Sequence, residues 1–265
     1  MLNRVLKLLA EMTTEQKVAQ MIQPEIRDIT VEDMRKYVFG SYLNGDGAFP
    51  NGDKRASVGG LKAGAQSVMA SFNSWDCDKI HRNKYLLTTV LKDRMGFDGF
   101  VVGDWIGHGQ IQGCTNESCS QAINAGLDMF MAPTKSWKPL FYNTVNQVKD
   151  GTIPLSRVND AVSRILRVKL RAGLFRKPSL TQRLYAGDSN MMGNQQHRAL
   201  AREAVRKSMV LLKNKVRILP LSPKQNILIT GDGAHNIGKQ SGGWTITWQA
   251  TNNTNADFPR WNFNL

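Results

Sequence analysis

Short, continuous apolar runs separated by helical patterns restrict this chain to a small set of folds. Three such runs are clear, at residues 67–72, 100–102 and 127–131. Between them, apolar residues recur every three or four positions in residues 86–95 and 140–148, and a glycine follows each pattern. Runs that are apolar on both faces and alternate with helices are typical of a parallel sheet covered by helices. The sequence therefore predicts an α/β fold, either doubly wound or a barrel.

Two helix starts can be placed from their capping residues. Thr13 is followed three residues later by Gln16, which is the pattern of a capping box. Thr30 precedes a second set of apolar positions at helical spacing. We expect a helix to begin after each threonine, and a further strand at residues 38–43.

The pattern changes after residue 173, where a mostly polar stretch indicates a linker. A helix at about residues 197–212 and a strand at residues 227–230 are predicted beyond it. These elements indicate a second domain.

Composition excludes several classes of protein. With 41% hydrophobic and 21% charged residues, the chain can build a packed core, so whole-chain disorder and collagen-like structure are excluded. No apolar run approaches the roughly 18 residues of a membrane-spanning helix. The first ten residues lack the pattern of a signal peptide. We expect a soluble chain with no membrane partner and no targeting signal.

The net charge of +14 is concentrated in one part of the chain. Between Arg157 and Arg217, fifteen lysines and arginines stand against three acidic residues. Such a patch could contact the phosphates of a nucleic acid. The alternative is that the basic residues up to Arg171 form the solvent face of a helix whose apolar face runs from Val158 to Leu166. Because no aromatic residues interleave with the basic ones, we favour the helix face and expect no nucleic-acid partner.

The three cysteines are too few for a fold built on disulfides. Cys114 and Cys119 are close enough in sequence to close a small loop in an oxidising compartment, and reduced thiols fit the sequence equally well. A zinc site that combines them with His81 and His108 is disfavoured, because no pair has the C-x-x-C spacing. We expect no metal.

One predicted strand ends in a carboxylate followed by an indole, at Asp104 and Trp105. The carboxyl ends of parallel strands face the active site in α/β folds. A carboxylate beside an aromatic face suits a carbohydrate, because it can attack an oxocarbenium-like centre while the ring stacks on the sugar. The alternative is that Asp104 only caps the segment that follows.

The stretch GFDGFVVGDW at residues 96–105 resembles the nucleophile motif of glycoside hydrolase family 3, in the branch of β-glucosidases and β-glucan exohydrolases. Other stretches resemble the family in the same order: MTTEQKVAQM at 12–21, SVMASFNSW at 67–75, RILRVK at 164–169, AREAVRKS at 201–208 and SGGWTI at 241–246. The resemblance extends over nearly the whole chain.

This resemblance implies a retaining hydrolase that releases terminal β-D-glucosyl residues from a β-glucoside or β-glucan oligosaccharide, with Asp104 as the nucleophile and no cofactor. It implies that Trp105 and Trp244 hold the terminal glucosyl ring, and that Phe72 and Met69 also contact the sugar. Alternatively, both tryptophans pack in the core or between domains. Phe72 stands where many relatives have a tyrosine, and the alternative for it is an ordinary core residue.

The resemblance also implies an architecture: an incomplete (β/α)₈ TIM-type barrel as catalytic domain in residues 1–175, a linker in 176–196, and the beginning of an α/β sandwich domain in 197–265. A closed barrel takes about 250 residues and eight strands, and about four are apparent here. At residues 57–61 the sequence passes directly from the family-like N-terminal segment to the strand before the nucleophile strand. The strands and helices that it omits carry several sugar ligands in relatives. We expect an internally and C-terminally truncated relative.

The family's acid/base glutamate has no counterpart in the sequence. We therefore expect impaired activity that favours aryl glycosides, and association into an oligomer through unpaired sheet edges. Relatives are often periplasmic or secreted, whereas this N-terminus gives no sign of export. Two other hypotheses are a non-catalytic carbohydrate-binding protein that uses Trp105 and Trp244, and a basic nucleic-acid-binding protein.

Overall fold

The computed structural model describes residues 2–24, 30–39, 41, 64–176, 179–215, 218–244, 247–249, 254 and 256. The chain divides into two compact units. The first comprises Met1–Gly45 and Phe49–Arg176, and the second comprises Asp46–Ala48 and Lys177–Leu265.

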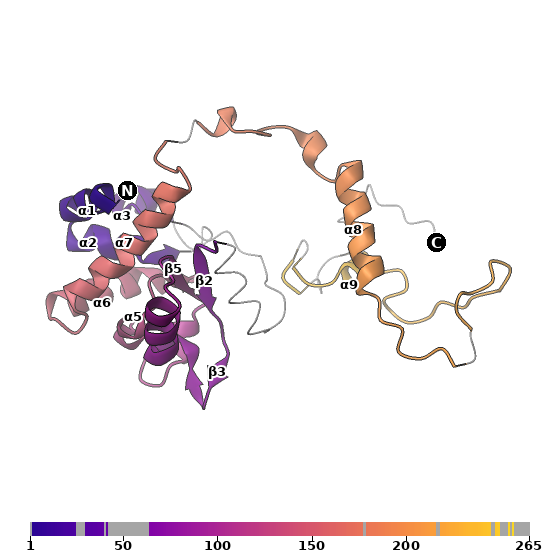
Figure 1. Ribbon diagram of the computed structural model, residues 1–265, viewed down its shortest axis with the longest axis horizontal. Coiled ribbons are helices and arrows are strands. Elements are labelled where there is room, and N and C mark those ends of the chain that lie inside the picture. The colour runs from indigo at the N-terminus through magenta and orange to yellow at the C-terminus, as the bar shows by residue number, and fades with distance from the viewer. Residues whose placement is uncertain are drawn as a thin grey trace. The chain divides into compact units, whose positions relative to one another are not determined.

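Short parallel strands form the centre of the first unit. They are β1 (Ile22–Pro24), β2 (Ser67–Ala70), β5 (Phe100–Gly103) and β6 (Phe130–Ala132). β2 pairs with β5 and β1 pairs with β6, both in parallel, and Figure 1 shows β2 beside β5. A parallel bridge between Val102 and Met129 joins the two pairs, which gives the order β2, β5, β6, β1. The predicted α/β class is confirmed, although the sheets are small.

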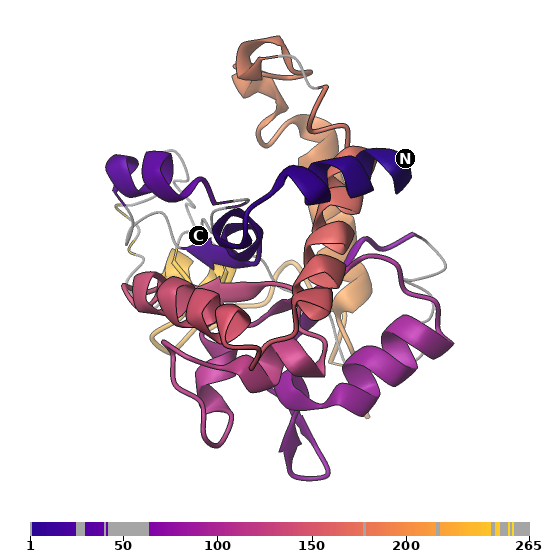
Figure 2. The ribbon, with the colours of Figure 1, turned by 90° about the vertical axis from the view of Figure 1, so that its left-hand side faces the viewer.

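Helices cover these strands. They are α1 (Leu2–Glu11), α2 (Thr14–Gln20), α3 (Val31–Tyr37), the π-helix η3 (Tyr85–Arg94), α5 (Ser120–Ala125), α6 (Trp137–Lys149) and α7 (Leu155–Arg171). α7 packs on β5, α6 packs on β1, and α1 crosses α7 (Figure 2). Their apolar faces bury Val101 and Phe130 almost completely. β6 is buried at every residue, which explains its continuous apolar character, whereas alternate residues of β5 are only partly buried.

Both predicted helix starts are confirmed. The Thr13 hydroxyl accepts a hydrogen bond from the Gln16 amide at 3.2 Å, and the Gln16 side chain accepts one from the Thr13 amide at 2.9 Å. At the start of α3, the Thr30 hydroxyl accepts the Asp33 amide at 3.1 Å. These caps satisfy amides that have no partner within the first helical turn.

The strand predicted at residues 38–43 is wrong where the structure describes it. Val38, Phe39 and Ser41 belong to no strand, and residues 40, 42 and 43 lie outside the described residues. Val38 has a φ of +49°, which is incompatible with an extended strand. Phe39 instead packs edge-on against Trp137 of α6, with ring centroids 5.3 Å apart.

A buried ion-pair network lies beside β5. Asp128 is fully buried and accepts hydrogen bonds from Lys92 Nζ at 2.7 Å and from the Val101 amide at 2.8 Å. Arg157 of α7 also donates to the Asp128 carboxylate and to the carbonyl oxygen of Leu127, the latter at 3.0 Å. Burial lowers the pKa of Lys92 to about 8, although the negative charge of Asp128 opposes this shift. The network joins η3, β5 and α7.

The prediction that the basic residues of α7 face solvent is therefore only partly right. Val158 and Leu166 are buried as predicted. Arg157 turns inward to Asp128, and Arg164 donates to the carbonyl oxygens of Phe97 and Gly99 at 2.7 and 3.0 Å. The guanidinium groups of Arg157 and Arg164, which were assigned to a surface patch, thus form hydrogen bonds inside the first unit.

The described part of the second unit contains the short helical turns η5 (Leu180–Gln182) and η6 (Ser189–Met191), and the helices α8 (Gln195–Ser208) and α9 (Ile237–Ser241). α8 corresponds to the helix predicted at 197–212. The strand predicted at residues 227–230 is wrong: these residues form no strand, and Leu228 is 86% exposed. An apolar run forms a stable strand only with a hydrogen-bonded neighbour, and none is found among the described residues of this unit.

Within the described ranges, no helix is long and apolar enough to cross a membrane.

Candidate active site

Asp104 follows directly on the last residue of β5 and is half-buried. Its amide donates to His81 Nε2 at 3.0 Å, and its carbonyl oxygen accepts the Gly107 amide at 2.9 Å. One carboxylate oxygen accepts the Trp105 amide at 2.7 Å. Among the residues that the structure describes, no basic side chain forms an ion pair with this carboxylate. The backbone is thus fixed on both sides of a carboxylate that none of the described basic side chains pairs with.

The turn after Asp104 contains an unusual backbone conformation. Ile106 adopts the left-handed conformation with φ +46° and ψ +24°, which is rare for a β-branched residue. Its amide donates to the Met131 carbonyl oxygen of β6 at 3.2 Å. Conformations of this kind cost free energy and cluster at functional sites, where the surrounding structure maintains them.

His81 lies beneath this turn, in the short 3₁₀ helix η2 (Ile80–Arg82), with no exposed surface. Burial, with smaller repulsion from His108 and Lys79, lowers the pKa of His81 to about 4. The imidazole is therefore neutral at physiological pH and accepts the Asp104 amide through Nε2. No functional role for His81 was predicted from the sequence, because its 23-residue separation from Asp104 carries no local signal.

The shifted pKa of His81 predicts a loss of stability in mild acid. An unfolded chain protonates this histidine near pH 6.5, whereas the folded chain resists protonation down to about pH 4. Stability from this group is complete above about pH 6.5 and decreases as the pH falls toward 4, by an upper estimate of about 2 kcal/mol at pH 5. Urea unfolding at pH 7 and pH 5 measures the difference. The variant His81→Gln should lose this part of the pH dependence, and an unchanged slope in that variant would contradict the assignment.

A second buried histidine supports the loop beyond Asp104. His108 lies in the 3₁₀ helix η4 (Gly107–Gln110) and donates from Nε2 to the Asn116 carbonyl oxygen at 3.1 Å. Its ring contacts that of Phe130, with centroids 4.6 Å apart. Asn116 lies in a turn closed by a disulfide between Cys114 and Cys119. The sequence left the state of these cysteines open, and the structure pairs them.

The hairpin after β2 is tied to the same loop. It consists of β3 (Ser74–Trp75) and β4 (Asp78–Lys79), which pair in antiparallel fashion. Lys79 Nζ donates to the Phe72 carbonyl oxygen at 3.1 Å and to Gln110 Oε1 at 2.9 Å. This lysine therefore joins the segments that follow β2 and β5 at the carboxyl ends of these strands.

The other predicted sugar contacts lie in different surroundings. Met69 is the parallel register partner of Val102, so it shares the face of the sheet that leads to Asp104. Trp105 is half-buried next to the carboxylate. Phe72 is 42% exposed, so the alternative that it is an ordinary core residue is wrong. Trp244 belongs to the second unit, is 48% exposed, and meets Trp248 edge-on at 6.1 Å; it is not a core residue.

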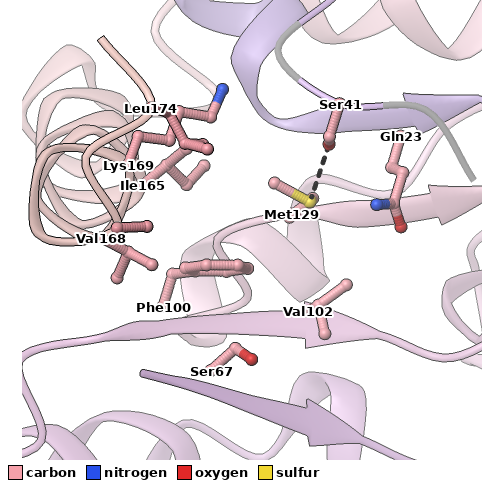
Figure 3. Close-up of a pocket in the computed structure, with 11 residues that line it drawn as sticks. Gln23, Ser41, Ser67, Phe100, Val102, Met129, Ile165, Val168, Lys169 and Leu174 are labelled. Carbon is pink, nitrogen blue, oxygen red and sulfur yellow. Dashed lines mark hydrogen bonds between the residues drawn. The ribbon is translucent and has the colours of Figure 1, made fainter. Parts of the chain in front are cut away.

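A largely apolar pocket of about 320 Å³ lies along the same face of the sheet, toward the start of β5. Figure 3 shows Phe100 and Val102 pointing into it from β5, with Ile165 and Val168 of α7 on another wall and Ser41 donating to Met129 Sδ. Asp104 does not line this pocket. In the described ranges, no group of three or more histidine, cysteine, aspartate or glutamate residues could hold a metal ion.

Comparisons with known proteins show which family the chain resembles. Residues 58–168 match the family model of the glycosyl hydrolase family 3 N terminal domain. The chain is 33% identical over 205 residues to the lysosomal beta glucosidase of Dictyostelium discoideum, and the match covers 74% of this chain and 24% of that protein. It is 32% identical over 198 residues to the periplasmic beta-glucosidase of Salmonella typhimurium, with 70% and 25% covered.

Among solved structures, a mutant exo-1,3/1,4-beta-glucanase from a Pseudoalteromonas species is similar, with a TM-score of 0.85 and 33% identity. The match covers 98% of this chain and 69% of that structure's chain. This chain therefore spans about a quarter of the length of the curated relatives and a larger share of this solved chain.

Proposed function

Because the chain belongs to glycoside hydrolase family 3, we propose that Asp104 is the nucleophile of a retaining β-glucosidase-type reaction that releases terminal β-D-glucosyl residues. The observation that carries this proposal is a half-buried carboxylate at the carboxyl end of β5, oriented by the Trp105 amide and without an ion-pair partner among the described side chains. A carboxylate in a salt bridge with a buried arginine would be a poor nucleophile, because the salt bridge would stabilise its negative charge.

In the proposed first step, a carboxylate oxygen of Asp104 attacks the anomeric carbon. The bond to the leaving group breaks, the leaving oxygen departs with the electron pair, and a glycosyl ester forms on Asp104. Water then attacks the same carbon from the opposite side, the ester bond breaks and its electron pair returns to the Asp104 carboxylate, so that glucose is released. The proton that water loses passes to the solvent and balances the charge of the departed leaving group. The contacts of the Asp104 backbone with His81 and Gly107 support this role, because they hold the attacking group in place.

The proposed substrate is a β-glucoside or a β-glucan oligosaccharide. Trp105 is next to the nucleophile, and Trp244 presents an exposed indole, so both are suited to stacking on the apolar face of a sugar ring. Met69 and Phe72, on and just beyond β2, complete the proposed sugar contacts. The names of the relatives, two beta-glucosidases and an exo-1,3/1,4-beta-glucanase, agree with this substrate class.

We also propose that residues 1–175 form part of a TIM-type barrel, that residues 176–196 form a linker, and that residues 197–265 begin an α/β sandwich domain. The pairing of β1 with β6 supports the barrel, since closure requires the first strand to lie beside the last. In the described residues, β1 and β2 each have a hydrogen-bonded neighbour on one side only. Such edges support the proposal of association between copies.

Trapping of the glycosyl ester tests the nucleophile. The 265-residue chain is incubated with 2-deoxy-2-fluoro-β-D-glucosyl fluoride, which has a leaving group that needs no proton, and is then digested. We expect peptide mass spectrometry to find the fluoroglucosyl group on Asp104. A label on another carboxylate, or no label, would contradict the proposal; Asp104→Asn should remain unlabelled. The non-catalytic carbohydrate-binding hypothesis predicts no label on any residue.

A further inference from the structure

The contact between His81 and Asp104 defines the protonation state of the histidine. The Asp104 amide can only donate, and it lies 3.0 Å from His81 Nε2. Nε2 must therefore be unprotonated and accept the hydrogen bond. A neutral imidazole carries one proton, so this proton is on Nδ1.

The remaining nitrogen of His81 has no hydrogen-bond partner among the residues that the structure describes. Nδ1 is buried, and none of the described residues accepts its proton. Burying a donor without an acceptor costs free energy, and native structures seldom leave such a group. If the ring served only to fill space, an apolar side chain would avoid this cost. His81 is oriented so that Nε2 accepts the Asp104 amide, although this leaves Nδ1 without an acceptor among the described residues.

One of the two glycines near Asp104 makes room for this ring. A Cβ atom on Gly107 would lie 2.4 Å from both Cε1 and Nε2 of His81, which is closer than real Cβ atoms approach. A Cβ atom on Gly103 would lie 3.5 Å from Nε2, in ordinary contact. The turn around Asp104 is therefore built in close contact with the imidazole.

We propose that His81 is a positioning residue for the proposed nucleophile, which it holds through the Asp104 amide while Gly107 leaves space for its ring. This inference rests on the proposed function of Asp104. The bond acts on the backbone, next to the Cα atom that carries the carboxylate. A misplacement of about 1 Å at a reacting group can cost about 100-fold in rate.

The surroundings of His81 keep it an acceptor over a wide range of pH. Burial has the largest effect on its pKa, and electrostatic repulsion from His108 of η4 and Lys79 of β4 also disfavours a positive charge on the ring. The pKa of His108 is itself lowered by burial. The Asp104 amide therefore keeps its partner throughout the neutral range.

Inactivation kinetics with the fluoroglucosyl fluoride test the proposal. His81→Leu removes the acceptor, whereas His81→Gln can present an amide oxygen in its place. We expect His81→Leu to lower the maximal rate of Asp104 labelling about 100-fold with little change in the half-saturating concentration of inactivator, and His81→Gln to recover to within about tenfold of the wild type. His197→Gln changes an exposed histidine of α8, which belongs to the second unit, and serves as the control. It should label at close to the wild-type rate.

Two results would overturn the proposal: His81→Leu that labels as fast as the wild type, or His81→Gln that is as slow as His81→Leu. Circular dichroism of each variant verifies that it is folded. A separate measurement distinguishes failure of this inference from failure of the nucleophile assignment. Nitrogen-15 spectra of the histidine rings should show His81 protonated on Nδ1 only, from about pH 8 to about pH 5. A ring protonated on Nε2, or one that titrates near the ordinary histidine pKa of about 6.5, would refute the hydrogen bond whether or not Asp104 takes a label.

Discussion

Asparagine in place of Asp128 is expected to lower the free energy of unfolding by about 3–5 kcal/mol. The carboxylate is fully buried between Lys92 Nζ, at 2.7 Å, and the guanidinium of Arg157. Removing its charge leaves the buried ammonium group of Lys92 with the carboxylate of Asp160, 3.8 Å away and 44% exposed, as its counter-ion, and leaving a buried charge poorly compensated is costly. The already lowered pKa of Lys92 should decrease further, because the attraction by Asp128 is what opposes the effect of burial.

Urea unfolding of the two proteins at neutral pH measures this difference. Asp98→Asn is the matched control, because Asp98 pairs with Arg171 at a largely exposed position and its loss should cost less than about 1 kcal/mol. A second variant, Asp128→Asn combined with Lys92→Met, should recover part of the lost stability, since it removes the poorly compensated buried charge as well. If Asp128→Asn unfolds within about 1 kcal/mol of the wild type, the network is not important for stability.

This network also shows where prediction from the sequence ends. The capping box at Thr13 and the strand at β5 were predicted because both depend on residues close together in the chain. Asp128, Lys92 and Arg157 are brought together by the packing of η3 and α7 around β5, and no local pattern encodes that packing. The basic residues of α7 were therefore assigned to solvent, although two of them point inward.

The candidate site likewise contains one residue that the sequence predicts and one that it does not. The carboxylate at a strand end, Asp104, follows from the apolar run before it and from its resemblance to a family motif. His81, by contrast, is polar, isolated in the sequence and buried, and only the fold reveals that its Nε2 faces the Asp104 amide. The prediction of a strand at residues 227–230 was wrong although its apolar run is a clear local signal. Strand formation also depends on a neighbouring strand elsewhere in the chain.

Asp104→Asn is expected to abolish turnover of an activated aryl β-glucoside, with a loss of about 10⁴-fold or more relative to the wild type. An amide of the same shape can still accept the Trp105 amide, so the fold of the turn should be kept, but it cannot form the glycosyl ester. A dinitrophenyl β-glucoside is the suitable substrate, since its leaving group departs without a proton and the measurement depends on the nucleophile alone. Release of dinitrophenolate measures the rate, and Asp98→Asn serves as the control that should retain activity.

A small anion can then distinguish a lost nucleophile from a damaged site. Asp104→Ala leaves a space where the carboxylate was, and azide can enter it and attack the anomeric carbon while dinitrophenolate leaves. Because azide approaches from the face that Asp104 occupied, the product should be the α-configured glucosyl azide, opposite to the configuration of the substrate. Recovery of dinitrophenolate release with this product supports a direct attack by Asp104. Release that azide does not raise, or a β-configured azide, would mean that the carboxylate does not face the anomeric carbon, and the proposed mechanism would have to be abandoned.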